Sequence, residues 1–199
     1  MKTTITFGIL ALLFVLGTGC AKVPQQAVDS AQLSLQDARL QEADVFAPEL
    51  FNAAQDSFNA AQAEIELQGG KFALTRSYDS AEQLLASASD LSRQASEQGA
   101  VRKQEMRTET EGLLLQARET AAQARMLLTQ APRGKEGRIA LVSIGSDVSS
   151  LDSLFVEVEE LLAQGNVKLA NERALVAMDR ATSLTGELQQ AINKTKGRG

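Results

Sequence analysis

Apolar residues recur at alternating intervals of three and four positions along most of this chain, which is the pattern of one face of an α-helix. The first helix is predicted to follow Pro24, because proline fits the first helical turn. Pro48 disfavours helical geometry at Ala47 and can open a second helix, which Gln68-Gly69-Gly70 should end with a left-handed residue. The two apolar stripes are Val28, Ala31, Leu35, Ala38 and Val45, and then Leu50, Ala54, Phe58, Ala61 and Ile65.

A third stripe starts after Lys71, and it is interrupted from residue 96 to residue 112, where nearly every position is polar. Two interpretations stay open: one long helix from about residue 71 to 130, kinked near Gly99 or Gly112, or two helices that meet in the polar interval. A helix that is polar all round must project into solvent or bridge two packed regions. We favour the single long helix. Its stripe is Leu74, Tyr78, Ala81, Leu85, Ala88, Leu91 and Ala95 before the interval, and Leu114, Ala117, Ala121, Ala124 and Leu128 after it.

The clearest loop of the chain is residues 131–137, APRGKEG. A fourth helix should follow it and end at Gln164-Gly165, after which Asn166 is a good N-cap for the last helix. The heptad spacing of the last stripe fits either a helix packed within a bundle or an oligomeric coiled coil, and its alanines favour intramolecular packing. The two stripes are Ile144, Val148, Leu151, Phe155, Val158 and Leu162, and then Val167, Ala170, Ala174, Ala177, Ala181, Leu184, Leu188 and Ala191.

These patterns together predict an all-α fold of elongated antiparallel helical hairpins or a bundle, with a long middle helix. The expected organisation is a signal peptide at 1–19, a lipidated tether at 20–24, a first helical hairpin region at 25–98, a polar helical connector at 99–112, a second helical hairpin region at 113–194 and a flexible tail at 195–199.

The amino terminus is the most hydrophobic part of the chain, and it ends at the only cysteine. Lys2 precedes an uncharged run from Ile5 to Leu16, which as a helix would span about 18 Å. That length is short of the roughly 30 Å hydrocarbon core of a bilayer, and it fits the apolar region of a secretory signal.

The small residues Gly17, Thr18 and Gly19, which lead into Cys20, resemble the signal of a bacterial lipoprotein, although Gly17 stands where leucine is usual. The resemblance implies that the Cys20 sulfur carries a diacylglyceryl group and that cleavage falls between Gly19 and Cys20. In many lipoproteins that this signal resembles, an aspartate directly after the cysteine marks retention in the inner membrane. This chain has Ala21 there, so we expect the protein to be anchored in the outer membrane, facing the periplasm. An ordinary signal peptide with an incidental cysteine, or a buried free thiol, is the alternative.

Residues 24–98 carry a second resemblance, which rests on Phe46-Ala47-Pro48-Glu49-Leu50 and Gly69-Gly70-Lys71-Phe72-Ala73, each before an Ala-rich helix. They look like a family of uncharacterised helical envelope lipoproteins, a domain of unknown function. Phe46 and Phe72 replace tyrosines that are frequent in that family. The family implies no catalytic residue.

Composition excludes several kinds of chemistry. The chain has no His and a single Cys, which removes the commonest general base, the commonest metal ligand and any Cys-based zinc site. Its net charge of -5 lacks the basic footprint of a nucleic-acid binder. Two groups of carboxylates remain, Glu105, Glu109 and Glu111, and Glu157, Glu159 and Glu160, and we interpret both as solvated helix faces. We therefore expect no enzyme, no cofactor and no metal.

The sequence thus favours a lipid-anchored structural or adaptor module with a protein partner in the cell envelope. The alternative is a periplasmic carrier of an apolar ligand, held between Ala-lined helices. Two surfaces are candidates for contacts: the mixed-charge segment 102–107 for a partner, and Lys194, Lys196 and Arg198 for anionic lipid or cell-wall polymer.

Overall fold

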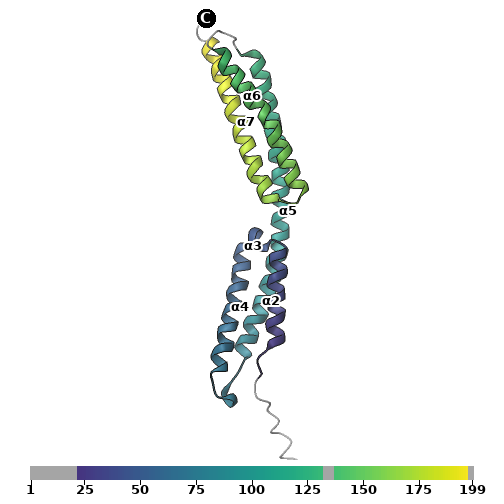
Figure 1. Ribbon diagram of the computed structural model, residues 1–199, viewed down its shortest axis with the longest axis vertical. Helices are drawn as coiled ribbons and strands as arrows, with labels where there is room; N and C mark the ends of the chain where they lie inside the picture. Colours follow the sequence, from purple (N-terminus) through teal and green to yellow (C-terminus); the bar gives the residue numbers. More distant parts are fainter. Residues whose placement is uncertain (1–21, 132–136, 197–199) are drawn as a thin grey trace, which may run out of the picture. The chain divides into compact units, whose positions relative to one another are not determined.

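The computed structural model describes residues 22–131 and 137–196, and Figure 1 shows its helices. Within these two ranges the chain is helical, with no strand, so the predicted all-α class is confirmed. The predicted signal peptide, Gly19 and Cys20 lie outside the described residues. The described chain falls into two compact units, which meet in sequence between Ala100 and Val101. The long helix α5 (Asp79–Gln130) contributes to both units.

The first unit contains α2 (Gln25–Leu40), α3 (Ala43–Phe46), α4 (Pro48–Gly69) and the first part of α5. Both prolines act as the sequence predicts. Pro24 is the residue before α2, and its carbonyl accepts a hydrogen bond from the Val28 N–H over 3.0 Å. Pro48 is the first residue of α4, and Ala47 before it is not helical.

A tight turn separates α2 from α3. Glu42 adopts the left-handed conformation, with φ of 60°, and turns the chain so that Ala43 and Phe46 are buried. Val45 was expected to continue the stripe of α2, but this turn rotates it outward and leaves it 41% exposed. The prediction for Val45 is therefore wrong, because a stripe keeps its face only while the helix is continuous.

The core of the first unit is built largely from alanine, which lets the helices approach closely. The remaining predicted stripe residues Val28, Leu50, Ile65 and Leu91 are half-buried against this core. The core residues are Ala31, Leu35, Ala38, Ala43, Ala47, Phe51, Ala54, Phe58, Ala61, Leu85, Ala88 and Ala95.

The segment between α4 and α5 corrects three expectations. Gly70 has φ of −76°, so α4 does not end with a left-handed glycine. Instead, Arg76 donates hydrogen bonds to the carbonyls of Gly69 and Lys71, over 2.9 and 2.8 Å. The carbonyl of Gly69, the last residue of α4, thereby gains a partner that the helix itself does not provide. A short 3₁₀ helix, η1 (Ala73–Thr75), follows, and α5 begins at Asp79 rather than near residue 71. Leu74, expected on the buried stripe, is 77% exposed.

The second unit packs the later part of α5 against α6 (Gly137–Ala163) and α7 (Val167–Lys196). The turn between α6 and α7 follows the sequence pattern. Gly165 has φ of 78°, its N–H donates to the Leu162 carbonyl over 3.1 Å, and the Asn166 N–H donates to the Leu161 carbonyl over 2.9 Å. These two bonds are those of a glycine-terminated helix end. The Asn166 carbonyl then accepts from Ala170, which is the backbone position of an N-cap.

The three helices of the second unit contribute side chains of different size to its core. Helices α5 and α7 supply mostly alanines, whereas α6 supplies large side chains. At the end of α7 the buried position is Ile192 rather than the expected Ala191, which is half-buried. The other buried residues of this core are Leu114, Ala117, Ala121, Ala124, Ala131, Val148, Leu151, Phe155, Val158, Leu162, Ala170, Ala174, Ala177, Ala181, Leu184 and Leu188.

Candidate functional site

The residues predicted to be lipidated and cleaved, Cys20 and Gly19, lie outside the described residues, as does Arg198. Lys194 is exposed near the end of α7. Among the described helices, none combines the length and the hydrophobicity needed to cross a membrane.

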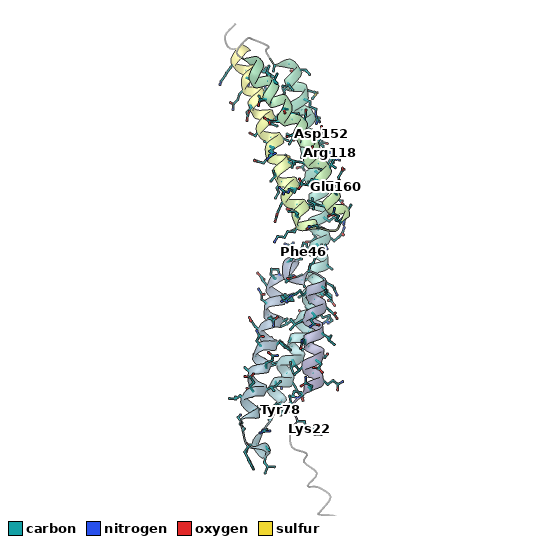
Figure 2. The ribbon with its side chains drawn as sticks, in the orientation of Figure 1. Lys22, Phe46, Tyr78, Arg118, Asp152 and Glu160 are labelled. Carbon is teal, nitrogen blue, oxygen red and sulfur yellow. The ribbon has the colours of Figure 1, made fainter. Side chains whose placement is uncertain are left out.

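Two of the three clustered glutamates of α6 form ion pairs with neighbouring helices of the second unit. Glu157 pairs with Arg173 of α7 over 2.9 Å, and Glu159 pairs with Arg118 of α5 over 2.8 Å. The Arg118 guanidinium also lies over the Phe155 ring, 5.6 Å from its centroid, and Figure 2 labels Arg118 on α5 and Glu160 on α6. In the part of the chain that the structure describes, no three His, Cys, Asp or Glu side chains are grouped so that they could hold a metal ion.

The mixed-charge segment 102–107 makes contacts within its own unit. Arg102 pairs with Glu105 one turn along the helix, over 2.9 Å. Arg107 pairs with Glu111 over 3.3 Å and also donates to the Leu162 carbonyl. The Arg107 side chain therefore hydrogen-bonds the C-terminal turn of α6.

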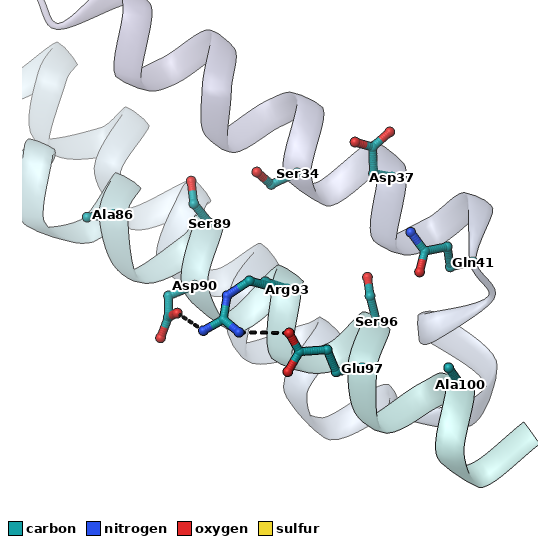
Figure 3. Close-up of a pocket in the computed structure, with 10 residues that line it drawn as sticks. All are labelled: Ser34, Asp37, Gln41, Ala86, Ser89, Asp90, Arg93, Ser96, Glu97 and Ala100. Carbon is teal, nitrogen blue, oxygen red and sulfur yellow. Dashed lines mark hydrogen bonds and ion pairs between the residues drawn. The ribbon is translucent and has the colours of Figure 1, made fainter.

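A groove of about 880 Å³ runs along the first unit between α2 and α5, on a face that α4 does not line. Figure 3 shows Ser34 and Asp37 of α2, and Gln41 directly after it, on one side of the groove, facing the residues of α5 across the gap. Half of the lining side chains are alanine or serine. The α5 side consists of Ala86, Ser89, Asp90, Arg93, Ser96, Glu97 and Ala100.

An ion-paired triad lies along the α5 side of the groove. Arg93 donates to Asp90 over 2.6 Å and to Glu97 over 2.8 Å, and Gln94 donates to Asp90 over 2.8 Å. The hydrogen bonds donated by Arg93 and Gln94 lower the pKa of Asp90 below its usual 3.8. The bonds that Arg93 donates to Asp90 and Glu97 raise the pKa of Arg93. The side chains of Asp90, Arg93 and Glu97 are each more than half exposed, so each can also bind water or a partner molecule.

The charges on the groove are unbalanced. Asp37, Asp90 and Glu97 carry negative charge, and Arg93 is the positive charge among the lining residues. An acidic groove of which half the lining side chains are small fits a helix that carries small residues and cations, because small side chains allow two helices to approach closely. A carrier of an apolar ligand would instead need an enclosed apolar volume. The groove between α2 and α5 is open to solvent rather than enclosed.

Sequence reasoning missed this groove because it followed only the apolar stripe. The pattern that marks the groove lies one position along α5 from the buried stripe, where four small residues and Arg93 repeat at the same heptad spacing. The members of this second stripe are Ala86, Ser89, Arg93, Ser96 and Ala100.

A scan against protein-family models found no match to the chain, and searches of curated proteins and of solved structures found no similar protein. The interpretation of the groove therefore depends on its geometry alone.

Proposed function

We propose that this protein is a lipid-anchored, non-catalytic adaptor of the cell envelope, tethered through Cys20 and binding a helix of a partner protein in the groove between α2 and α5. The groove is the observation that carries the adaptor role. The pattern from Lys2 to Cys20 supports the anchor, and the periplasmic face of the outer membrane is the proposed location.

The energetics of anchoring fit this proposal. One acyl chain holds a protein at a bilayer only marginally, whereas two or more chains anchor it stably, since each buried methylene contributes about 0.8 kcal/mol. A cysteine that carries a diacylglyceryl group therefore needs no membrane-spanning helix. The short segment between Cys20 and Pro24 would keep the start of α2 within about 14 Å of the anchor, at roughly 3.5 Å per residue.

The partner proposed for the groove is a helix with small residues on one face and lysine or arginine beside them. Such a helix would meet Asp37 on one wall and Glu97 on the other. Arg93 would lie beside the bound helix and would repel a partner helix that carries a lysine or arginine directly opposite it. Like charges that face each other discriminate against wrong partners.

The anchor is tested by the intact mass of the protein extracted from membranes, with Cys20→Ala as the matched variant. A chain that begins at residue 20 with added acyl mass, which the variant lacks, supports it. An unmodified chain that is cut elsewhere and found in the soluble fraction would rule the anchor out.

The groove is tested by a photo-cross-linking amino acid at Ser89, with the same group at Asn52 on the exposed face of α4 as the control. We expect one discrete adduct from Ser89, formed with a basic helical segment of the partner. Asp37→Lys should abolish that adduct, whereas Asp56→Lys, on exposed α4, should leave it intact. Equal adducts from both positions, or insensitivity to Asp37→Lys, would refute groove binding even if the anchor is present.

A further inference from the structure

The segment between α4 and α5 exposes two large apolar side chains that are two positions apart in sequence. Phe72 is 72% exposed and Leu74 is 77% exposed, and Leu67 in the last turn of α4 is 59% exposed. Exposed apolar residues are common when scattered singly, but a contiguous group marks an interaction site. We call residues 69–77 the apolar loop.

Hydrogen bonds hold the apolar loop in place while it exposes these side chains. Arg76 bonds the carbonyls of Gly69 and Lys71, and the Thr75 hydroxyl donates to the Phe72 carbonyl over 2.9 Å. The backbone of Ser77 donates to the Gln68 side chain over 3.3 Å. The loop is therefore fixed before it meets any surface, which lowers the entropy lost on binding.

The charges of the apolar loop are all positive. Lys71 and Arg76 flank Phe72 and Leu74, and there is no Asp or Glu from Leu67 to Tyr78. Apolar side chains flanked by cations are the composition of segments that lie in a membrane interface, where lysine and arginine contact the phosphates of anionic lipids.

The apolar loop also lies at the end of the first unit where the anchor would be. Because α2 and α5 run in the same direction, both begin at this end, and a depression lined by Pro24, Gln26 and Glu82 joins their first turns. Figure 2 labels Lys22 and Tyr78 at this same end of the unit. Pro24 lies four residues after Cys20, so a lipid on Cys20 would bring the surface of the bilayer to this end.

From these observations we infer that the apolar loop inserts Phe72 and Leu74 into the lipid interface, with Lys71 and Arg76 at the headgroups. The partner is a lipid surface, and the loop is a second contact that fixes the orientation of the first unit on the membrane. The nearness of the loop to the bilayer rests on the proposed Cys20 anchor.

The absence of tryptophan from the chain allows a direct test. Phe72→Trp places a single fluorophore in the apolar loop, and Leu40→Trp places one at the opposite end of α2, at a residue that is 82% exposed. Each variant is purified from membranes, its intact mass is measured, and it is incorporated into phosphatidylglycerol–phosphatidylcholine vesicles with brominated acyl chains. We expect the bromines to remove about half of the Phe72→Trp emission, as for a ring at the acyl boundary, and to leave the Leu40→Trp emission nearly unchanged.

The mass and the quenching separate the two proposals. Acylated protein in which neither tryptophan is quenched, or both are quenched equally, would overturn the loop insertion and leave the anchor standing. Unacylated protein in which only Phe72→Trp is quenched would support the loop and remove the anchor. Unacylated protein without quenching would remove both.

Discussion

The Nη2 atom of Arg107 donates to the carbonyl oxygen of Leu162 over 2.9 Å, although the two residues are 55 positions apart. The same carbonyl accepts the Gly165 N–H over 3.1 Å, so Arg107 contacts the last turn of α6 where the helix dipole is negative. A cation at that position stabilises the helix end, and here it also joins α5 to α6. The later part of the polar interval, residues 101–112, thus takes part in the packing of the second unit.

Replacing Arg107 by alanine should lower the free energy of unfolding of the second unit by about 1 to 2 kcal/mol, because a hydrogen bond from a charged group is lost from a partly exposed site. Urea unfolding followed by circular dichroism measures this change. Arg102→Ala is the control, since Arg102 pairs only along the helix surface with Glu105, and it should cost less than about 0.5 kcal/mol. Equal losses from the two variants would show that the bond to Leu162 contributes nothing specific.

A second polar contact fixes the alignment of α5 and α7. The Asn171 side chain donates to the Thr110 hydroxyl over 3.0 Å, and that hydroxyl donates to the Met106 carbonyl over 2.7 Å. Thr110 is fully buried. Alanine-lined helices can slide past one another with little change in packing, so a buried polar pair can specify their register.

Thr110→Val keeps the shape of the side chain and removes the hydroxyl. We expect it to lower the stability of the second unit by about 1 kcal/mol, and a double-mutant cycle with Asn171→Ala should give a coupling energy of similar size. Thr182→Val is the matched control, because the Thr182 hydroxyl is exposed and bonds only its own helix. A coupling energy near zero would mean that Asn171 finds an equivalent partner in water.

The periodicity of the sequence predicted most of the fold because each stripe lies on a continuous helix. It failed where the backbone turns between stripes. In the sequence, Val45 continues the apolar spacing of α2 and Leu74 that of α5. In the structure, the turn at Glu42 separates Val45 from α2, and Leu74 lies in the apolar loop before α5 begins. At Glu42 no glycine or proline marks the turn, so turn chemistry gave no signal there. At the apolar loop, Gly69-Gly70 signalled the end of α4 but not that α5 begins only at Asp79.

The groove and the polar contacts escaped prediction for another reason. Arg107, Thr110 and Asn171 read as ordinary polar residues of helices, and only the packing of three helices brings them together. Cys20 is the opposite case, since its proposed role follows from local sequence and lies outside the described residues.

The glycines of the helices provide a graded test of the backbone. Gly112 faces open space, so Gly112→Ala should stabilise the protein by about 1 kcal/mol, the difference in helix propensity. An added Cβ at Gly99 would contact the Ala43 Cα at 3.4 Å, an ordinary distance, so Gly99→Ala should stabilise while Gly99→Leu destabilises by about 1 to 3 kcal/mol. Gly165 has a positive φ, and Gly165→Ala should cost about 1 kcal/mol. Thermal unfolding of the four variants ranks them, and a stabilising Gly99→Leu would contradict the close approach of Ala43.

The triad of Asp90, Arg93 and Glu97 makes the titration of Asp90 depend on Arg93. Because hydrogen bonds from Arg93 and Gln94 lower the pKa of Asp90 below 3.8, the pair with Arg93 contributes its full stabilisation above the unfolded pKa. That contribution is lost as the pH falls through the lower folded pKa, and it is small because the pair is exposed and screened. Arg93→Gln removes the larger cause, so the Asp90 carboxyl should titrate at a higher pH than in the unaltered protein, as read from its ¹³C chemical shift. Arg102→Gln, which alters a pair elsewhere on α5, should leave the Asp90 titration unchanged. If both variants moved the midpoint equally, overall charge rather than the triad would set the pKa of Asp90.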